Sequence, residues 1–527
     1  MTNEGGAGHF HVYRSIFSRS KRADIAMRNA GYFGIRHNWS IGSRRFVDAR
    51  DIGGWAVPLM IQGNTILDSP EGLAISVENP GPTLLLDNTI ISRAEVTNGP
   101  VVTLMAGLDG EYAAVGNTFT VTNAIVARPR LLELETKVVA AKTIAPVELP
   151  GAVTPPARQR KTFELPATAD TGTIQAAIQQ AAKLKGRRPV VHLPAGQYSI
   201  TATLTTPAGA DVQIVGDGYE TELRWGGPAD SPMLVLAGPV RATFRDLTLT
   251  GNEQAPLLVA TNCDQPGSRI YGDQLTVHRV GTGLLVDGLE QADVSLDTFY
   301  HSGCRDISVR VVGSRAAAAG KRAAARTVIF GGASSNSPFN YDVVNGGRLM
   351  AQDIWYEGSP VTFLKLAGSG TFTLSGAKIA PGLPGANMPS SDPSFAGVAL
   401  DHFRGRATFL SAITHTRVVV AGDDAAANLL LLGVQPGGPE MLLPPPPQAR
   451  VALRYSRRYA EGKPPTVSVP DVGAASPEWI LQMLEQVRTD IPRPLRVVRG
   501  SATDLRFYRV QVQNGGTGIH LQSSSKQ

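Results

Sequence analysis

Long apolar runs are missing from this chain of 527 residues. No stretch reaches the about 18 consecutive apolar residues that a transmembrane helix needs, and residues 1–10 lack the apolar segment of a signal peptide. The sequence therefore predicts no membrane span and, in the chain as given, no signal peptide. With only two cysteines, a disulfide-built scaffold is also excluded.

Charged and aromatic residues are scarce, at 18% and 6%, whereas the chain has 56 glycines and 37 prolines. This composition is typical of many short strands joined by tight turns. The formal net charge is +6 and the pI is near 9.3, with Arg and Lys scattered along the sequence. We expect no nucleic-acid partner, and a weak preference for an acidic glycan stays open.

A single ordinary core is excluded at this length, so we expect either several domains or a solenoid. Residues 168–225 favour the solenoid. A helix is predicted near 173–185, because apolar residues recur at helical spacing after the turn DTGT. Short strands such as VVHL follow, and one helix before many strands is suited to cover the open end of stacked coils.

A short Asn motif recurs in the first 130 residues. It contains Asn38, Asn64, Asn88 and Asn117, at spacings of 26, 24 and 29 residues. Asn tolerates left-handed backbone and can hydrogen-bond to its copy in the next coil. We therefore interpret these four residues as structural.

The repeats predict an all-β solenoid, a right-handed parallel β-helix in two side-by-side regions, with a short C-terminal helix near 477–488 followed by a returning coil. The predicted parts are a first β-helix region at 1–130, a connector at 131–165, a second β-helix region at 166–440, a Pro-rich connector at 441–475 and a C-terminal segment at 476–527. No capping helix precedes the first region, so we expect that the chain lacks the start of that β-helix.

Cys263 and Cys304 lie 41 residues apart. In coils of about 20–25 residues, that separation is about two coils, or roughly 9–10 Å along a stack of strands. Because this exceeds the reach of a disulfide, we expect two free, buried thiols. The redox compartment stays open.

Two polar columns are predicted when five strands of the second region are aligned without gaps. The last positions of the strands are Thr250, His278, His301, Asn336 and Glu357. The first positions are Asp246, Gln274, Asp297, Gly332 and Asp353. Stacking at about 4.8 Å per coil would form a polar strip about 20 Å long, and neighbouring aromatic rings would stack on sugar faces.

Glu357 is the predicted general acid of this predicted column. A carboxyl beside Trp355 and Tyr356 is partly desolvated, which raises its pKa. Asp353 or Asp297 would serve as the partner base. The predicted substrate-binding residues are His278, His301, Asn336, Phe299, Trp355 and Tyr356. A structural alternative stays open for these residues. Glu357 would then end a strand in a solvated turn, the histidines would bond to neighbouring coils, and the aspartates would form a turn ladder.

Other chemistry has no support in the sequence. Residues 216–218 and 281–283 are Gly-rich turns that no helix follows, which excludes a phosphate-binding loop. No pair of His or Cys has metal-ligand spacing, so we predict no metal and no cofactor. A Gly-x-Ser-x-Gly nucleophile turn is also absent.

The run DTGTIQAAIQQAA with VVHLPAGQY resembles the opening of the pectate-lyase-like β-helix superfamily, whose members mostly act on polysaccharides. Two β-helical regions joined by a connector resemble glycoside hydrolase family 55, a family of exo-acting β-1,3-glucanases with a catalytic Glu late in the second β-helix. By position, this resemblance matches Glu357 to the general acid. The motifs of polygalacturonases are absent.

The resemblance implies an extracellular or cell-surface glycoside hydrolase that acts on a β-glucan or a related polysaccharide. Two alternatives stay open. One is a polysaccharide lyase, in which His301 or an Arg removes a proton beside a uronate carboxylate. The other is a non-catalytic carbohydrate-binding or adhesion solenoid of the viral tailspike kind. The sequence does not define the oligomeric state.

Overall fold

The computed structural model describes most of the chain. The described residues are 2–3, 9–28, 32–50, 58–78, 81–92, 99–105, 111–128, 130–141, 159–237, 240–253, 258–261, 269–290, 292–314, 325–335, 337, 339–357, 364–380, 398–414, 418–422, 426–436, 446–455, 475–489, 508–512 and 519–523.

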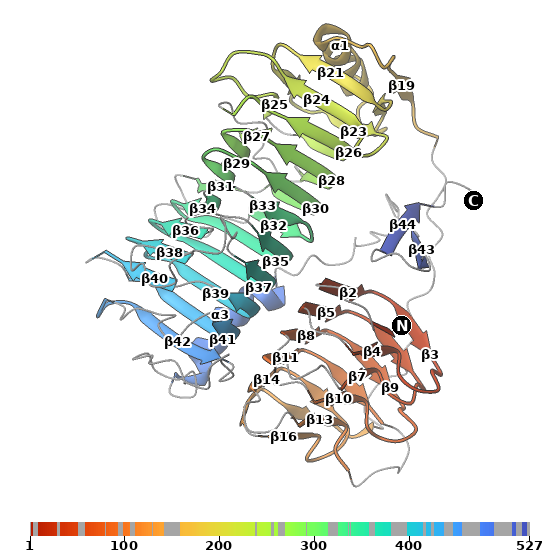
Figure 1. Cartoon of the computed structure of the whole chain (residues 1–527), viewed down its shortest axis with the longest axis vertical. Coiled ribbons are helices and arrows are strands. Elements are labelled where there is room, and N and C mark those ends of the chain that lie inside the picture. The colour runs from red at the N-terminus through yellow and green to blue at the C-terminus, as the bar shows by residue number, and fades with distance from the viewer. Residues whose placement is uncertain are drawn as a thin grey trace, which may run out of the picture. The chain divides into compact units, whose positions relative to one another are not determined.

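Two compact units make up the chain. The first contains Met1–Gln159, Arg454–Ala460 and Glu485–Gln527, and the second contains Arg160–Leu453 and Glu461–Leu484. Both are parallel β-solenoids, as predicted (Figure 1).

Three parallel sheets form the first unit, and each coil contributes one strand to each sheet. One sheet contains β1 (Thr2–Asn3), β4 (Ile25–Met27), β7 (Val47–Ala49), β10 (Ile75–Val77), β13 (Val102–Met105) and β16 (Ile125–Arg128). The next contains β2 (His9–Tyr13), β5 (Tyr32–Arg36), β8 (Leu59–Gln62), β11 (Thr83–Leu86), β14 (Glu111–Val115) and β17 (Arg130–Leu134). The third contains β3 (Ile16–Ser18), β6 (Trp39–Ile41), β9 (Thr65–Leu67), β12 (Thr89–Ile91), β15 (Thr118–Phe119) and β18 (Lys137–Val138).

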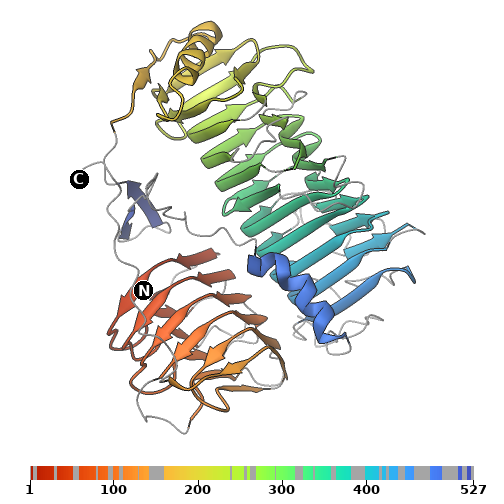
Figure 2. The ribbon, with the colours of Figure 1, turned by 180° about the vertical axis from the view of Figure 1, so that it is seen from behind.

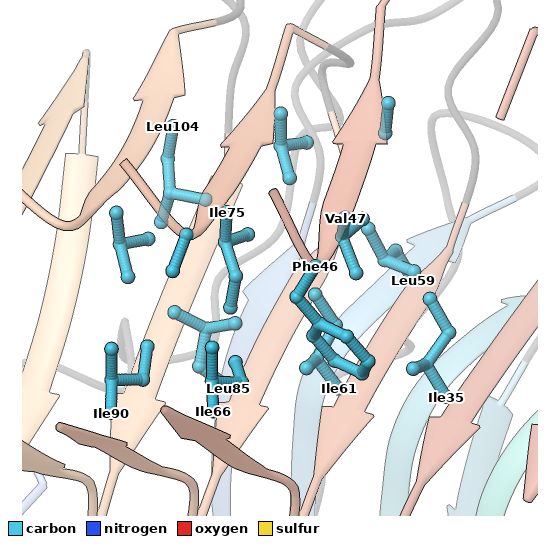
Figure 3. Close-up of a cluster of buried hydrophobic side chains, with 14 of the residues drawn as sticks. Ile35, Phe46, Val47, Leu59, Ile61, Ile66, Ile75, Leu85, Ile90 and Leu104 are labelled. Atoms are coloured by element: carbon cyan, nitrogen blue, oxygen red, sulfur yellow. The ribbon is translucent and has the colours of Figure 1, made fainter. Parts of the chain in front are cut away.

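Inward-facing apolar side chains fill the first unit. Ile35, Ile61 and Leu85 occupy one register position on consecutive strands and are at most 1% exposed. Figure 3 shows them in a row among the other core side chains, with Phe46 at Ile61. Each such side chain contributes about 1.5–3 kcal/mol by leaving water, so the stacked coils form one continuous core.

The repeated asparagines form a buried ladder, as predicted. The side-chain amide of Asn38 donates to the Asn64 Oδ1 at 3.0 Å, Asn64 donates to Asn88 at 2.9 Å, and Asn88 donates to Asn117 at 3.0 Å. The left-handed residue, however, is the one before each Asn, such as His37 (φ 56°) or Asp87 (φ 52°). The Asn side chain therefore serves as a hydrogen-bonding rung, and its backbone does not make the corner.

The second unit opens with α1 (Thr171–Ala182), which confirms the predicted capping helix. Asp170 caps it by accepting a hydrogen bond from the backbone N–H of Thr173 at 2.8 Å. Ile174, Ile178 and Ala181 are buried on one helix face. The local capping and periodicity signals thus agree with the tertiary packing.

Two parallel sheets run through the second unit. The larger contains β19 (Thr162–Glu164), β20 (Val190–Leu193), β21 (Gly196–Ile200), β23 (Asp211–Gly216), β24 (Thr221–Trp225), β26 (Arg241–Thr250), β28 (Arg269–His278), β30 (Asp293–Ser302), β32 (Arg326–Phe330), β33 (Ala333–Ser335), β35 (Gly347–Glu357), β37 (Gly370–Ala380), β39 (Arg406–Thr414), β41 (Asn428–Pro436) and β42 (Arg450–Tyr455). The smaller contains β22 (Leu204–Thr206), β25 (Leu234–Ala237), β27 (Leu258–Thr261), β29 (Thr282–Leu289), β31 (Ile307–Gly313), β34 (Phe339–Val344), β36 (Leu364–Ala367), β38 (Val398–Asp401) and β40 (Val418–Ala421).

The long strands of the larger sheet turn a corner at a single left-handed residue. These residues are Asp246 (φ 54°), Gln274 (φ 51°), Thr298 (φ 53°) and Asp353 (φ 55°), whereas two glycines, Gly331 (φ 68°) and Gly332 (φ 107°), make the corner between β32 and β33. Pairing resumes in register on both sides of the corner, for example from β26 to β28. The corner residues therefore form a turn ladder, which favours the structural interpretation of Asp246 and Asp353.

A second helix, α3 (Pro477–Thr489), agrees with the helix predicted near 477–488. Figure 2 shows it lying across the last strands of the larger sheet. Thr408 of β39 donates to the backbone carbonyl of Met483 at 3.1 Å, and the Trp479 indole N–H donates to Asn428 Oδ1 at 3.1 Å. No described helix has the length and apolar character to cross a membrane.

The predicted returning coil differs from the structure. β43 (Tyr508–Val512) and β44 (Ile519–Ser523) pair with each other in an antiparallel hairpin. The intervening sequence QNGGTG is rich in turn residues, which suits a hairpin better than a coil. Cys304 is a free, buried thiol, as predicted; Cys263 lies outside the described residues.

Candidate functional site

The observed register shifts the predicted polar column by one residue. Thr250 pairs with His278, and His278 pairs with Ser302 rather than with His301. Further along, Ser302 pairs with Ser335, which pairs with Glu357. Asn336 lies outside the described residues. The shift arises because Thr298, not Asp297, occupies the left-handed corner, so every later side chain of β30 changes face.

Three predicted substrate-binding residues lie in the core instead. Phe299, His301 and Tyr356 are 1–2% exposed, where a bound glycan cannot reach them. The His301 ring lies 5.3 Å from Phe299 and 6.1 Å from Tyr341, measured between ring centroids. Burial lowers the pKa of His301 to about 3, so the imidazole is neutral at physiological pH. The burial of His301 also excludes this residue as a lyase base that acts on a surface-bound glycan.

The outward side chains of β24, β26, β28 and β30 form the surface that we call the polar strip. Its members are Glu222, Arg224, Thr250, Thr276, His278, Tyr300 and Ser302. Tyr300 is 44% exposed, and Tyr219, in the loop before β24, is 70% exposed. The strip thus presents two aromatic rings beside hydroxyl, carboxylate, guanidinium and imidazole groups.

Hydrogen bonds between neighbouring coils order the polar strip. The Thr250 hydroxyl donates to Glu222 Oε1 at 2.6 Å, and Arg224 pairs with Glu222 at 2.9 Å. The His278 Nδ1 lies 2.6 Å from the Ser302 hydroxyl, and the Tyr219 ring meets the imidazole edge-on at 6.3 Å. These contacts fix the side chains before any ligand binds, which lowers the entropy that binding costs.

His278 is a neutral imidazole in this setting. Burial lowers its pKa, and the nearby Glu222 carboxylate offsets only part of that effect. A neutral ring can both donate and accept one hydrogen bond. Its Nδ1 is engaged by Ser302 and its Nε2 is buried, so His278 orders the polar strip, and the exposed side chains around it are the ones that a ligand can contact.

The two predicted partner bases, Asp353 and Asp297, lie apart on the stack. Asp353 is 3% exposed at its corner, and its Oδ2 lies 3.4 Å from the Gln352 amide. Asp297 shares a register position with Phe330 and Gln352 and so lies about 9–10 Å along the stack from β35.

The backbone of Glu357 shares a register position with Ser335 and, through it, with Ser302. Its backbone pairs with Ser335 on one side and with Ala380 on the other, but its side chain lies outside the described part of the structure. Trp355 is half-buried, two residues earlier on the same face, consistent with the predicted aromatic platform. Among the described residues, no group of His, Cys, Asp or Glu could hold a metal ion.

Sequence reasoning missed Tyr219, Tyr300, Glu222 and Arg224. Tyr300 follows Phe299 directly, and strand alternation places one ring inside and the other outside. The sequence alignment placed His278 beside His301 instead of Ser302, because it put the corner of β30 at Asp297 rather than at Thr298. Glu222 and Arg224 flank the buried Leu223 in an alternating pattern, a signal that could have revealed them.

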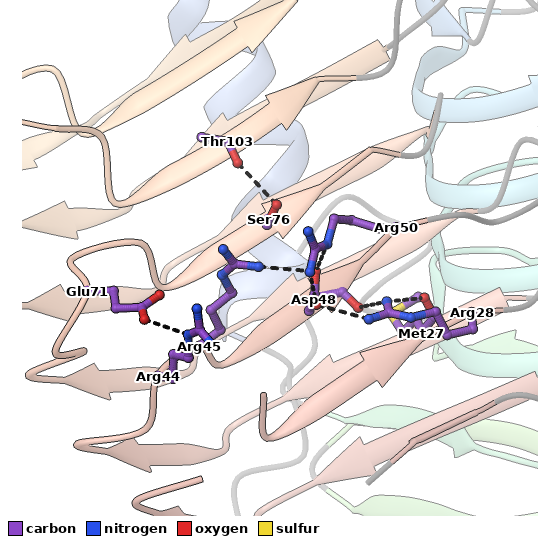
Figure 4. Close-up of polar contacts among 9 residues, drawn as sticks. All are labelled: Met27, Arg28, Arg44, Arg45, Asp48, Arg50, Glu71, Ser76 and Thr103. Atoms are coloured by element: carbon purple, nitrogen blue, oxygen red, sulfur yellow. Dashed lines mark hydrogen bonds and ion pairs between the residues drawn. The ribbon is translucent and has the colours of Figure 1, made fainter. Parts of the chain in front are cut away.

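A separate charged cluster lies on the first unit. Arg28, Arg45 and Arg50 surround Asp48, whose side chain is 8% exposed (Figure 4). Burial alone would raise the pKa of Asp48, but hydrogen bonds from Arg50 and Arg28 outweigh it and lower the pKa. The guanidinium groups are directed at this carboxylate, so the cluster is explained by the fold.

No family model and no curated protein matches this chain. Solved structures do. ORF18 of Geobacillus virus E2 is 10% identical with a TM-score of 0.29, and the match covers 56% of this chain but less than two thirds of ORF18, at 62%. The A-module of the Azotobacter vinelandii mannuronan C-5 epimerase AlgE4 is 15% identical, with a TM-score of 0.33, over 55% of this chain and 95% of the module.

The protein sacteLam55A from Streptomyces sp. SirexAA-E is 11% identical, with a TM-score of 0.25, over 85% of this chain and 86% of that protein. These likenesses carry no further conclusion at such TM-scores. The β-solenoid fold is shown by the strand pairing itself. Membership of glycoside hydrolase family 55 and the activity that it would imply stay predictions.

Proposed function

We propose that this protein binds a polysaccharide along the polar strip of the second unit. The observation that carries the proposal is the exposure of the Tyr219 and Tyr300 rings beside the ordered row Thr250, His278 and Ser302. Sugar rings present apolar C–H faces that stack on aromatic rings and hydroxyls that need several hydrogen-bond partners. An extracellular or cell-surface location is part of this proposal, because the protein would meet a structural polysaccharide there.

Removing a ring tests the proposal. We expect Tyr300→Ala to weaken glycan binding about tenfold, because aromatic contacts contribute about 0.5–1.5 kcal/mol beyond their buried area. Tyr300→Phe should retain most of the affinity. Calorimetry with oligosaccharides from a glycan array would measure this. Met105→Ala, which removes an exposed apolar side chain from the first unit, is the control; equal affinity in all variants would refute the strip as the binding surface.

Glycoside hydrolysis is the second candidate, because the backbone of Glu357 shares the register position of His278 and Ser302. In that case Glu357 would protonate the leaving oxygen. Reducing sugar released from laminarin and lost in Glu357→Gln would support it. An unsaturated uronate product would favour a lyase instead. Binding without turnover, unchanged in Glu357→Gln, would leave binding as the function.

A further inference from the structure

Positive charge gathers at the start of the second unit, contrary to the scattered distribution expected from the sequence. Residues 160–188 carry six basic and two acidic side chains, a net charge of +4 in a chain of net charge +6. The basic residues are Arg160, Lys161, Lys183, Lys185, Arg187 and Arg188. The fold brings them together because β19 and the C-terminal end of α1 adjoin.

Three of these cations line an open pocket of about 410 Å³, which we call the basic pocket. Its lining consists of Lys161, Phe163, Gln180, Lys183, Leu184 and Arg187. The Lys161 Nζ lies 5.7 Å from the centroid of the Phe163 ring. The volume falls within the about 300–1,000 Å³ of small-ligand sites.

Both acidic residues of this segment are engaged elsewhere. Glu164 lies on the other face of β19, where its Oε2 is 2.5 Å from His192 Nδ1. Asp170 caps the opposite end of α1. Arg188 is directed away as well, because it pairs with Asp211 at 3.4 Å. The lining of the basic pocket therefore has three cations and no carboxylate.

We propose that the basic pocket binds an acidic saccharide, recognising a uronate carboxylate. Lys183 and Arg187 would pair with the carboxylate, the apolar edge formed by Phe163 and Leu184 would contact the C–H face of the sugar ring, and the Gln180 amide would bond to a hydroxyl. The basic pocket is a separate site from the polar strip. The inference rests on the proposed function, polysaccharide binding, and adds the class of polysaccharide that is bound.

The geometry favours a saccharide over a nucleic acid. Phosphate backbones are bound by cations spread along the strand, whereas here three cations line one pocket. A purely structural role is the remaining interpretation, because cations near the C-terminal end of α1 stabilise the helix dipole.

Charge-matched double variants of the full chain test the proposal. Lys183→Gln with Arg187→Gln should weaken binding of oligogalacturonate or oligoalginate about tenfold, since two charge-assisted contacts are lost, and wild-type binding should weaken with added salt. Lys185→Gln with Lys21→Gln removes the same charge outside the pocket and should have little effect. Melting temperatures of both double variants should agree within about 2–4 °C.

Several results would overturn the inference. One is an equal loss of affinity in both double variants. Another is that the wild-type protein binds neither uronate oligomer. A third is that it prefers duplex DNA or anionic vesicles to the uronate oligomers. The two proposals are separable. Neutral glucan binding that depends on Tyr300, without uronate binding, refutes only the basic pocket; uronate binding that depends on Lys183 and Arg187 but not on Tyr300 refutes only the polar strip.

Discussion

Asn64 shows how one amide can hold three coils together. Its Nδ2 donates to the Ile35 carbonyl and to Asn88 Oδ1, both at 2.9 Å, and its Oδ1 accepts from the backbone N–H of Asn38 at 2.9 Å. The side chain is 1% exposed. Each net hydrogen bond is worth only about 1 kcal/mol, but a buried partner left unsatisfied costs about 1–3 kcal/mol.

Asn64→Ala should therefore lower the free energy of unfolding by about 3 kcal/mol. Denaturant titration followed by circular dichroism would measure this loss. Thr103→Ala is the control, because its hydroxyl makes one long hydrogen bond of 3.4 Å to Ser76 (Figure 4) and should cost less than about 1 kcal/mol. If the two variants lose equal stability, the ladder is not the stabilising feature.

His192 makes the stability of the second unit depend on pH. Burial alone would lower its pKa, but hydrogen bonds to Glu164 (2.5 Å) and Asp217 (2.9 Å) outweigh that effect and raise the pKa. The folded state thus holds the proton more tightly than the unfolded chain does. This stabilisation is complete below the unfolded pKa of about 6.5 and is lost as pH rises through the folded pKa.

We expect the difference in melting temperature between wild type and His192→Gln to be largest below about pH 6.5 and to shrink at higher pH. Differential scanning calorimetry across this range would measure it. His301, whose pKa is lowered, acts in the opposite direction by losing stability as pH falls. Because both proteins contain His301, the difference isolates His192. A difference that is constant with pH contradicts the prediction.

At the scale of whole elements, local signals were enough to predict both helices. Asp170 before α1 and Ser476-Pro477 before α3 mark helix starts, and the apolar spacing that follows specifies a buried face. The stacked asparagines were predictable for the same reason, since their spacing repeats. In each case one short segment carries the whole signal.

Register within β30 was not predictable from one sequence. Asp297 and Thr298 are adjacent polar residues, and either could occupy the left-handed corner; only packing against β28 and β32 selects Thr298. A slip of one residue exchanges the two faces of a strand. That exchange places Phe299 and His301 in the core and Tyr300 on the surface, opposite to what the alignment of the strands predicted.

Helix α3 covers outward side chains at the end of the second unit. Trp479 is 5% exposed, donates to Asn428, and lies under the Arg450 guanidinium, whose Cζ is 4.6 Å from the ring centroid. Trp479→Ala should destabilise the unit by about 3–5 kcal/mol, because it removes a large buried ring and leaves the Asn428 amide without this donor. Chemical denaturation monitored by circular dichroism would give the value.

Gln482→Ala is the matched control for that variant. Gln482 lies on the exposed side of α3, and a surface substitution there should change stability by at most about 0.5 kcal/mol. If Trp479→Ala behaves like Gln482→Ala, the helix does not depend on its buried face for attachment to the sheet. The loss expected for Trp479 alone would instead show that α3 is part of the folded unit.

The whole molecule contains two solenoids, and each buries its own core. In a stack of coils every coil contacts its immediate neighbours, so stability accumulates along one solenoid through nearest-neighbour contacts. Residues 142–158, between the last strand of the first solenoid and the first strand of the second, contain four prolines and no repeat motif. Cooperativity should therefore be high within each solenoid, and calorimetry tests whether it extends from one to the other.

Calorimetry of the full chain should accordingly resolve two unfolding transitions, and the variants above should assign them. Asn64→Ala, which acts within the first solenoid, should lower one transition temperature by several degrees and leave the other in place; Trp479→Ala should do the reverse. This holds because a lost contact destabilises only the cooperative unit that contains it. One shared transition that both variants lower equally would mean that the two solenoids unfold as a single cooperative body.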